Sequence, residues 1–193
     1  MEEVSEWILM NYGLYYKQVS FNRQSMQVVN TALSGNNFKW EEGKLFGQGE
    51  KESKRRSKIA WVKDEQLYIM LLKMVKQVNR SAGWNLKIGG VEPVQYAMYE
   101  PGGTYKWHVD QHPKPIFGNI RKISMSLFLN DDYEGGEFDL ELYSPGVDPR
   151  YKTFKLPSGS AIFFQADQWH RVRPVTSGVR KSLVAWFYGP PYV

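Results

Sequence analysis

The second half of the chain is divided by glycine, proline and aspartate into short apolar or alternating segments. Segments of this kind that are rich in β-branched and aromatic residues are typical of strands. So many short strands in succession predict two packed sheets in a jelly roll, also called a double-stranded β-helix. The eight core strands are expected at 94–99, 104–109, 122–129, 137–142, 151–156, 160–165, 170–175 and 181–188.

The first half predicts helices that pack on one of these sheets. Apolar residues recur at helical spacing over 21–33, and again over 64–83, where acidic residues at the start and a glycine at the end fit a helix. Residues 59–62 are expected to form a strand, and residues 1–20 either one or two edge strands or a short helix. Residues 35–57 are rich in glycine and charge, which predicts a mobile loop that is either a lid over a site or a plain connection.

The predicted fold class is therefore α+β, mainly β. No repeat or linker divides the 193 residues, so we expect a single domain over 1–193, with a supporting region at 1–83 and the jelly-roll core at 84–193. Met1 is followed by acidic residues, and no apolar run is long enough to span a bilayer. From these features we expect a cytoplasmic protein that does not enter a membrane.

Composition narrows the chemistry of any site. The chain has no cysteine and three histidines. Thiolate chemistry, disulfides and cysteine-held metals are therefore excluded, and any metal must be bound by His, Asp or Glu. The net charge is +5, and the excess of basic residues lies between positions 44 and 63. Such a run can hold phosphate groups or an acidic peptide, but a solvated loop is the simpler interpretation because no stacking aromatics alternate with the charges.

One short motif supplies two candidate metal ligands. Successive side chains of a strand point to opposite faces, so His108 and Asp110 are expected to project together. An imidazole and a carboxylate held in this way can form two corners of the 2-His-1-carboxylate site that binds Fe(II) and leaves coordination positions open. His170 is the candidate third ligand, because a jelly roll can bring the second and seventh strands side by side. Taken alone, His170 is better explained as a strand-end histidine that satisfies a backbone group.

The last expected strand carries a second candidate feature. Arg180 and Ser182 are two residues apart and therefore share a face, which Trp186 continues. A guanidinium inside a barrel needs a partner, and a carboxylate bound through both oxygens, with an added hydroxyl donor, is the natural one. Two alternatives remain open, namely a core salt bridge to Glu137 or Asp139, and an arginine that points outward.

The ordered motifs at 99–110, 121–124, 134–138, 170–175 and 178–182 together carry a resemblance that no one of them carries alone. The chain resembles the Fe(II)/2-oxoglutarate-dependent dioxygenases, in particular the prolyl-4-hydroxylase-like group and the bacterial PKHD-type hydroxylases. The resemblance covers roughly residues 56–190.

This resemblance implies a role for each site residue. The catalytic residues that ligate Fe(II) would be His108, Asp110 and His170. The residues that bind or enclose the 2-oxoglutarate cosubstrate would be Arg180, which pairs with its distal carboxylate, together with Ser182, Tyr99 and Trp186.

Other residues near the motif have less certain assignments from sequence. Tyr105, Trp107 and Arg56 are candidate substrate contacts, and packing inside the barrel is the alternative for the two aromatic residues. His112 is expected to be a loop residue near the mouth of the site and not a ligand, because the prolines that follow it argue against a helix.

The implied reaction uses O2 to convert 2-oxoglutarate to succinate and CO2 while a C–H bond is hydroxylated, with ascorbate as the reductant. The resemblance favours a prolyl residue of a peptide or protein, but fold does not fix substrate. One alternative is a nucleic-acid demethylase of the same superfamily, although Arg173 and Arg180 do not reproduce its R-x-N-x-T-x-R pattern. The other is a non-catalytic metal-binding jelly-roll module. The sequence leaves the oligomeric state open.

Overall fold

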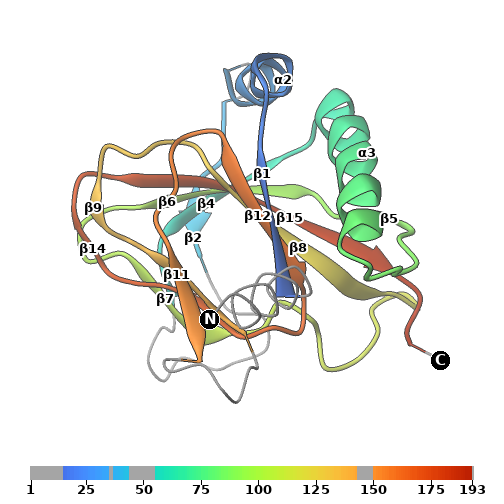
Figure 1. Cartoon of the computed structure of the whole chain (residues 1–193). Helices are drawn as coiled ribbons and strands as arrows, with labels where there is room; N and C mark the ends of the chain where they lie inside the picture. The colour runs from blue at the N-terminus through green and yellow to red at the C-terminus, as the bar shows by residue number, and fades with distance from the viewer. Residues whose placement is uncertain (1–14, 35–36, 44–54, 143–149, 193) are drawn as a thin grey trace, which may run out of the picture.

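The computed structural model describes residues 15–34, 37–43, 55–142 and 150–192. In this part of the chain the protein is mainly β, with antiparallel sheets and two helices that lie together on one side (Figure 1). None of the described helices is long and apolar enough to cross a membrane.

The largest sheet has eight strands and supports both helices. Its strands are β1 (Tyr16–Ser20), β2 (Glu41–Glu42), β4 (Lys58–Val62), β5 (Gly90–Val91), β6 (Val94–Tyr99), β8 (Ile120–Phe128), β12 (Ser160–Gln165) and β15 (Arg180–Gly189). The strand order is β1-β12-β8-β15-β6-β4-β2, and β5 pairs with β15. The long strand β15 lies at the centre of the sheet, between β8 and β6. Its side chains point alternately to the two faces of the sheet.

Two smaller sheets complete the β structure. The five-stranded sheet contains β3 (Arg55–Arg56), β7 (Thr104–His108), β10 (Phe138–Glu141), β11 (Tyr151–Phe154) and β13 (His170–Val172). Its strand order is β11-β10-β13-β7-β3. The two-stranded sheet pairs β9 (Glu134–Gly135) with β14 (Val175–Ser177).

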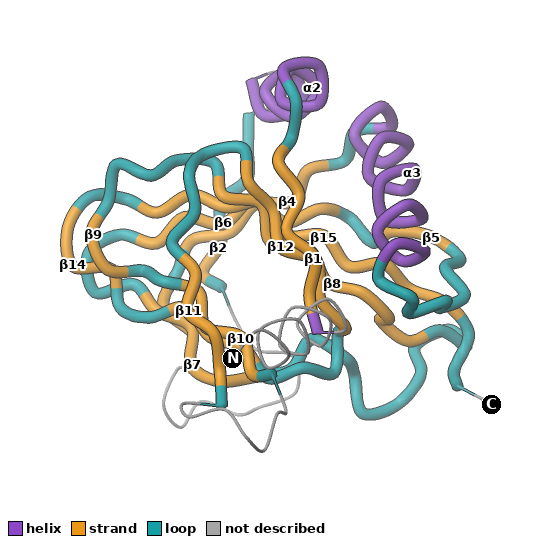
Figure 2. Tube along the Cα trace, viewed as in Figure 1, coloured by secondary structure: helices purple, strands orange, loops and turns teal. Residues whose placement is uncertain are grey.

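The two helices cover one face of the largest sheet, as the apolar periodicity predicts (Figure 2). These are α2 (Arg23–Ser34) and α3 (Glu65–Ser81). The side chain of Asp64 caps α3 by accepting a hydrogen bond from the backbone N–H of Leu67 at 2.8 Å. The buried stripe of α3 packs in one apolar cluster with alternate residues of β8, β12 and β15.

A second apolar cluster lies between the two larger sheets. It contains Tyr99 from β6, Phe128 from β8, Leu140 from β10 and Phe164 from β12. On β15, odd-numbered Leu183 and its alternate neighbours join the helix-side cluster, whereas the even-numbered positions from 180 to 186 line a pocket between the sheets. The prediction that Arg180, Ser182 and Trp186 share an inward face is therefore consistent with the structure.

Some strand boundaries differ from those expected. The strand expected over 170–175 is divided into β13 and β14, because Pro174 has no N–H to donate to a ladder. Short strands such as β2, β3 and β9 occur besides the eight that the pattern predicts. Of the edge strands expected over 1–20, β1 is present and residues 1–14 lie outside the described residues. Most of the expected loop over 35–57 also lies outside them.

A buried carboxylate ties together the outer face of the five-stranded sheet. Asp139 has a fully buried side chain, and its Oδ2 accepts hydrogen bonds from Nε of Arg171 at 2.6 Å and from Nε of Arg173 at 2.8 Å. The hydroxyl of Thr153 donates to its Oδ1 at 2.7 Å. Burial alone would raise the pKa of Asp139, but these hydrogen bonds lower it below its ordinary value.

We expect Asp139→Ala to lower the free energy of unfolding by about 2 kcal/mol at pH 7, because the hydrogen bonds to its buried carboxylate are lost. The loss is not larger because both arginines are partly exposed and regain contact with water. The folded-state pKa is lowered, so this stabilisation is present above the unfolded carboxyl pKa of about 4 and is lost as the pH falls through the folded pKa. Urea unfolding of both proteins at neutral and acidic pH measures the difference. A difference that does not shrink in acid would contradict this account of Asp139.

Candidate active site

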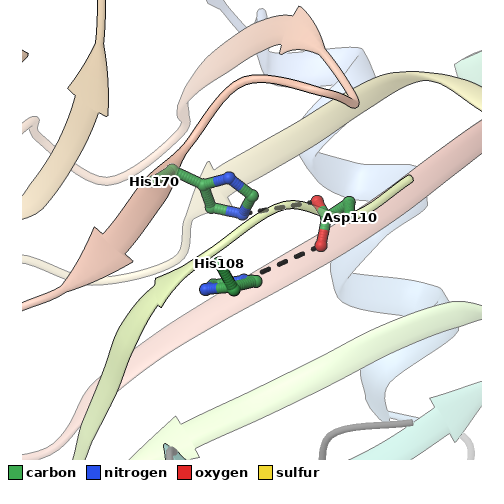
Figure 3. Close-up of side chains that lie close together, drawn as sticks. All are labelled: His108, Asp110 and His170. Atoms are coloured by element: carbon green, nitrogen blue, oxygen red, sulfur yellow. Dashed lines mark ion pairs between the residues drawn. The ribbon is translucent and has the colours of Figure 1, made fainter. Parts of the chain in front are cut away.

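Two neighbouring strands bring the candidate ligands together (Figure 3). β7 ends at His108 and β13 begins at His170, and the antiparallel pairing of these strands places the two residues opposite each other. Asp110 lies just beyond the end of β7, where its backbone N–H donates to the carbonyl oxygen of Ala166 at 3.0 Å. The strands expected as second and seventh, β7 and β13, are therefore adjacent. Asp110 lies outside β7 and is held by its backbone hydrogen bond to Ala166.

The three side chains are buried and their polar atoms converge. Oδ1 of Asp110 lies 3.8 Å from Nε2 of His108, and Oδ2 lies 3.4 Å from Nε2 of His170. One potential ligand atom from each residue lies within 4.8 Å of the others. The geometry therefore brings together the two histidines and the aspartate that the sequence singles out.

Backbone carbonyl groups fix the orientation of both imidazole rings. Nδ1 of His108 lies 2.8 Å from the carbonyl oxygen of Lys106, and Nδ1 of His170 lies 2.9 Å from that of Gln168. A carbonyl oxygen only accepts, so Nδ1 carries a proton in each ring and Nε2 is the ring nitrogen that faces Asp110. Burial and the proximity of His170 lower the pKa of His108 to about 3, so its ring is neutral at physiological pH.

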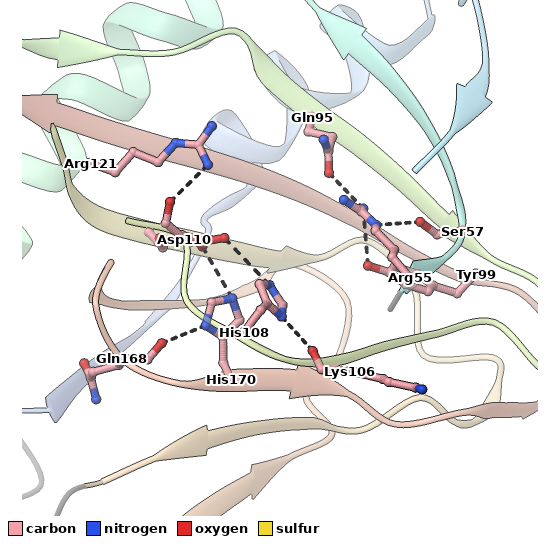
Figure 4. A network of polar contacts seen from close by, with 11 residues as sticks. Arg55, Ser57, Gln95, Tyr99, Lys106, His108, Asp110, Arg121, Gln168 and His170 are labelled. Carbon is pink, nitrogen blue, oxygen red and sulfur yellow. Dashed lines mark hydrogen bonds and ion pairs between the residues drawn. The ribbon is translucent and has the colours of Figure 1, made fainter. Parts of the chain in front are cut away.

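Two residues of β8 also hold Asp110, and Figure 4 shows the contact that Arg121 makes with it. Its Oδ2 accepts a hydrogen bond from the hydroxyl of Ser124 at 2.7 Å, and its backbone carbonyl accepts one from Nη1 of Arg121 at 3.3 Å. Arg121 is itself fixed by Glu92, at 2.8 and 2.6 Å. Burial alone would raise the pKa of Asp110, but His170 and the other neighbouring groups hold it well below the ordinary value.

This donor set fits a ferrous ion. Two neutral imidazole nitrogens and one ionised carboxylate are the ligands of the 2-His-1-carboxylate iron site. The ring nitrogens that do not face Asp110 are engaged by carbonyl groups, which is the outer-shell arrangement that orients histidine ligands toward a metal.

Ser124 offers a test of that outer shell. We expect Ser124→Ala to weaken Fe(II) binding about tenfold, because the carboxylate of Asp110 loses the hydrogen bond that orients it. Titration of the metal-free protein with Fe(II) under anaerobic conditions measures the affinity. Ser160→Ala, a substitution of another buried serine outside the pocket, is the matched control. Equal affinities in the two variants would remove Ser124 from this role.

A buried cation lies in the same pocket. Arg180 is 1% exposed, and its Nη1 donates to the hydroxyl oxygen of Ser182 at 3.0 Å. Its Nε and Nη2 have no hydrogen-bond partner among the described residues. The salt bridge to Asp139 considered from sequence is absent, because Asp139 binds other arginines on the outer face of the sheet. Two unsatisfied guanidinium nitrogens in a buried pocket fit a ligand carboxylate.

A glycine turn makes room for this arginine. Gly136 has a φ of +64°, and a Cβ at this position would lie 3.0 Å from Cδ of Arg180. Gly135 also has a positive φ, of +68°. At Gly136 the lack of a side chain is therefore needed for packing as well as for backbone conformation.

The remaining predicted cosubstrate residues also lie at the pocket. Tyr99 and Trp186 are buried and line it, and the indole nitrogen of Trp186 has no hydrogen-bond partner among the described residues. His112, by contrast, lies in the loop after β7 and does not belong to the group that converges on Asp110.

Of the two neighbouring arginines Arg55 and Arg56, it is Arg55 that lines the pocket, and the predicted substrate contact at Arg56 stays a prediction. Arg56 is exposed and does not line the pocket, whereas its neighbour Arg55 is buried and does. Nε of Arg55 donates to the hydroxyl oxygen of Ser57 at 2.7 Å, and Nη2 donates to Oε1 of Gln95 at 2.8 Å. The two residues alternate in β3, so the tertiary position of this strand decides which arginine points inward.

A β-bulge changes the predicted orientation of the motif side chains. His170 pairs with His108 and Val172 pairs with Tyr105, so two residues of β7 lie opposite the single residue Arg171. Tyr105 and His108 therefore both face the pocket although they are three positions apart, and their rings stack with centroids 3.4 Å apart. Trp107 does not line the pocket. Strict alternation along β7 is therefore interrupted between Tyr105 and His108.

Sequence reasoning missed several residues that hold the site in place. Gln95 carried no recognised signal in an apolar strand pattern. Arg121 and Ser124 stood within a motif that supported the family resemblance, but nothing in the sequence connected them to Asp110.

Residues 94–188 match the sequence model of the 2OG-Fe(II) oxygenase superfamily. By this match, the chain belongs to that superfamily. Fe(II) and 2-oxoglutarate are the metal and cosubstrate that define the family, and the buried triad and the unpaired guanidinium fit them. The resemblance predicted from the motifs is confirmed.

Curated relatives narrow the similarity within this superfamily. The chain is 38% identical over 98 residues to a PKHD-type hydroxylase of Synechococcus sp. (strain CC9902), a match that covers 50% of this chain and 41% of the relative. It is 33% identical over 101 residues to a PKHD-type hydroxylase of Bordetella pertussis, covering 49% of this chain and 42% of that protein. The matches thus span about two fifths of the length of these relatives.

Solved structures share the fold over most of the chain. A viral collagen prolyl hydroxylase from Paramecium Bursaria Chlorella virus-1, solved with 2-oxoglutarate, has a TM-score of 0.64 at 21% identity and covers 91% of this chain and 96% of its own. A prolyl-4-hydroxylase from Pseudomonas putida has a TM-score of 0.61 at 21% identity, with 90% and 91% covered. At this identity the similarity shows the fold alone.

Proposed function

We propose that this protein is an Fe(II)- and 2-oxoglutarate-dependent dioxygenase that hydroxylates a C–H bond and converts 2-oxoglutarate to succinate and CO2. One observation carries the proposal: the buried triad of His108, Asp110 and His170 shares a pocket with the buried, unpaired guanidinium of Arg180. The triad would hold Fe(II), and Arg180 with Ser182 would hold the distal carboxylate of 2-oxoglutarate. Bound iron supplies the activation of O2 for the oxidation.

The surrounding residues have positioning roles in this proposal. The carbonyl groups of Lys106 and Gln168 accept from Nδ1 of the two imidazoles and so direct Nε2 of each ring toward the metal position, and Ser124 orients the carboxylate of Asp110. Tyr99 and Trp186 wall the pocket and exclude water, which strengthens the pairing of a carboxylate with Arg180.

The proposed substrate is a prolyl residue of a peptide or protein. Support comes from the prolyl hydroxylases that share the fold, one of which, from Trichoplax adhaerens, was solved with a hypoxia inducible factor peptide fragment. We further propose that residues 1–193 form one domain and that its two larger sheets form the double-stranded β-helix. A role as a nucleic-acid demethylase is less well supported, because Arg173 is bound to Asp139 on the outer face and not directed into the pocket.

Mass spectrometry tests the activity and the substrate together. The protein is incubated with Fe(II), 2-oxoglutarate, ascorbate and a library of proline-containing peptides, and we expect a gain of one oxygen atom on proline with stoichiometric succinate. Oxidation of another residue would refute the prolyl assignment but retain the dioxygenase class. If no succinate forms and Fe(II) with 2-oxoglutarate gives no anaerobic charge-transfer absorbance, the protein is a non-catalytic module and the proposal fails.

A further inference from the structure

A second groove lies on the outer face of the five-stranded sheet. It is formed by neighbouring strands β7 and β13 and by β11 at the sheet edge. Three basic side chains line it, Lys106, Arg171 and Arg173, together with the aromatic residues Trp107 and Tyr151. None of the described residues that line it is acidic. The proposed reaction, which takes place on the opposite face of β7 and β13, does not account for this combination.

The bulge in β7 creates this arrangement. Because two residues of β7 lie opposite Arg171, the side chains of Lys106 and Trp107 both reach the groove. The guanidinium carbon of Arg171 lies 4.8 Å from the centroid of the Trp107 ring and 5.5 Å from that of Tyr151. The guanidinium carbon of Arg173 lies 5.9 Å from the centroid of Tyr151. Both guanidinium groups are therefore packed against rings, not extended into solvent.

The arginines are also anchored from below. Oδ2 of Asp139 accepts a hydrogen bond from Nε of each arginine, and Nη2 of Arg173 donates to the hydroxyl oxygen of Thr153 at 3.1 Å. One buried carboxylate compensates only one of the two positive charges. Arg171 and Arg173 keep 31% and 35% of their side-chain surface exposed. The groove thus holds two guanidinium groups in fixed positions beside Lys106. Because these side chains are already ordered, Arg171 and Arg173 lose little conformational entropy when an anion binds.

We propose that this groove binds an acidic segment of the polypeptide substrate, outside the residue that enters the iron pocket. This inference rests on the proposed function. Carboxylates fit the exposed parts of these two guanidinium groups, whereas stacked bases need ring faces that Arg171 and Arg173 already cover. Tyr105 and Val172 line both the groove and the pocket, so the two sites adjoin.

Fluorescence anisotropy of a labelled peptide tests this site without any turnover. The probe is a short fluorescein-labelled peptide of alternating Glu and Ala, compared with the matched Gln and Ala peptide and with an oligothymidylate of equal charge. We expect the full chain to prefer the Glu peptide, and Arg171→Gln with Arg173→Gln to raise its Kd about tenfold. The charge-matched control is Lys73→Gln with Lys76→Gln on α3, which should leave the Kd unchanged.

A second variant is needed because Arg171→Gln with Arg173→Gln removes both arginine partners of the buried Asp139, and the double variant could fail to fold. Lys106 is exposed and is not a partner of Asp139. Lys106→Glu should therefore keep the fold and raise the Kd of the Glu peptide about threefold or more. The anaerobic absorbance of Fe(II) with 2-oxoglutarate, measured on the unmodified protein, reports on the iron site by itself and so separates failure of the groove from failure of the iron site. Equal affinity for the Glu and Gln peptides overturns the proposal. Tighter binding of oligothymidylate that the same variants abolish would assign the groove to nucleic acid and overturn it too.

Discussion

Asp110→Ala is expected to abolish Fe(II) binding and 2-oxoglutarate turnover together. Asp110 is the carboxylate on which both Nε2 atoms of the triad converge, at 3.8 and 3.4 Å, and two neutral rings alone attract a divalent cation weakly. Loss of an outer-shell partner costs about 10- to 100-fold in metal affinity, so loss of the ligand itself should exceed about 100-fold. Anaerobic Fe(II) titration and succinate release measure the two effects.

The remaining histidine provides the matched control for this prediction. His112 follows Asp110 by two positions but does not join the triad, so His112→Ala should retain Fe(II) binding and turnover. Thermal unfolding of the metal-free variants shows whether each one folds. Full turnover by a folded Asp110→Ala protein would refute the ligand assignment.

Arg180→Met is expected to separate cosubstrate binding from metal binding. Removal of a buried charge that pairs with a ligand carboxylate should raise the Kd of 2-oxoglutarate by about 100-fold or more, while Fe(II) binding is retained. Because Nε and Nη2 of Arg180 are unpaired among the described residues, the same substitution should raise the free energy of unfolding of the ligand-free protein by about 1–4 kcal/mol. A salt-bridged structural arginine would show the opposite effect on stability.

Lys181→Met is the control for Arg180→Met. Lys181 is the next residue of β15, but it is exposed and lies outside the pocket. We expect it to bind 2-oxoglutarate with the affinity of the unmodified protein, measured by the charge-transfer absorbance with Fe(II) under anaerobic conditions. If Arg180→Met and Lys181→Met bind the cosubstrate equally well, Arg180 has no part in its recognition.

Much of the secondary structure could be predicted from local patterns. The strands at 94–99 and 160–165 have the expected bounds, and α3 follows its apolar stripe. The apolar alternation of β15 correctly placed Arg180 and Ser182 on one face. These features are local, since strand and helix periodicity depends on residues a few positions apart.

The ligand set was also accessible from sequence, but its supports were not. The spacing of His108 and Asp110 and the ordered motifs around His170 pointed to the triad. Ser124 and Arg121 approach Asp110 only because β8 crosses behind it in the folded sheet. No pattern within a few residues of either one records that contact.

The sequence by itself determined which side chains are available for metal chemistry, because with no cysteine and three histidines the choice was narrow. The tertiary structure alone decided which partner each charged group finds. It directs Arg55 and not Arg56 into the pocket and pairs Asp139 with Arg171 and Arg173. Nε and Nη2 of Arg180 are left without a hydrogen-bond partner among the described residues. The bulge in β7 likewise turns Tyr105 inward and Trp107 outward. Strand register and bulges arise from pairing between distant segments, so a single residue of shift changes which side chains meet.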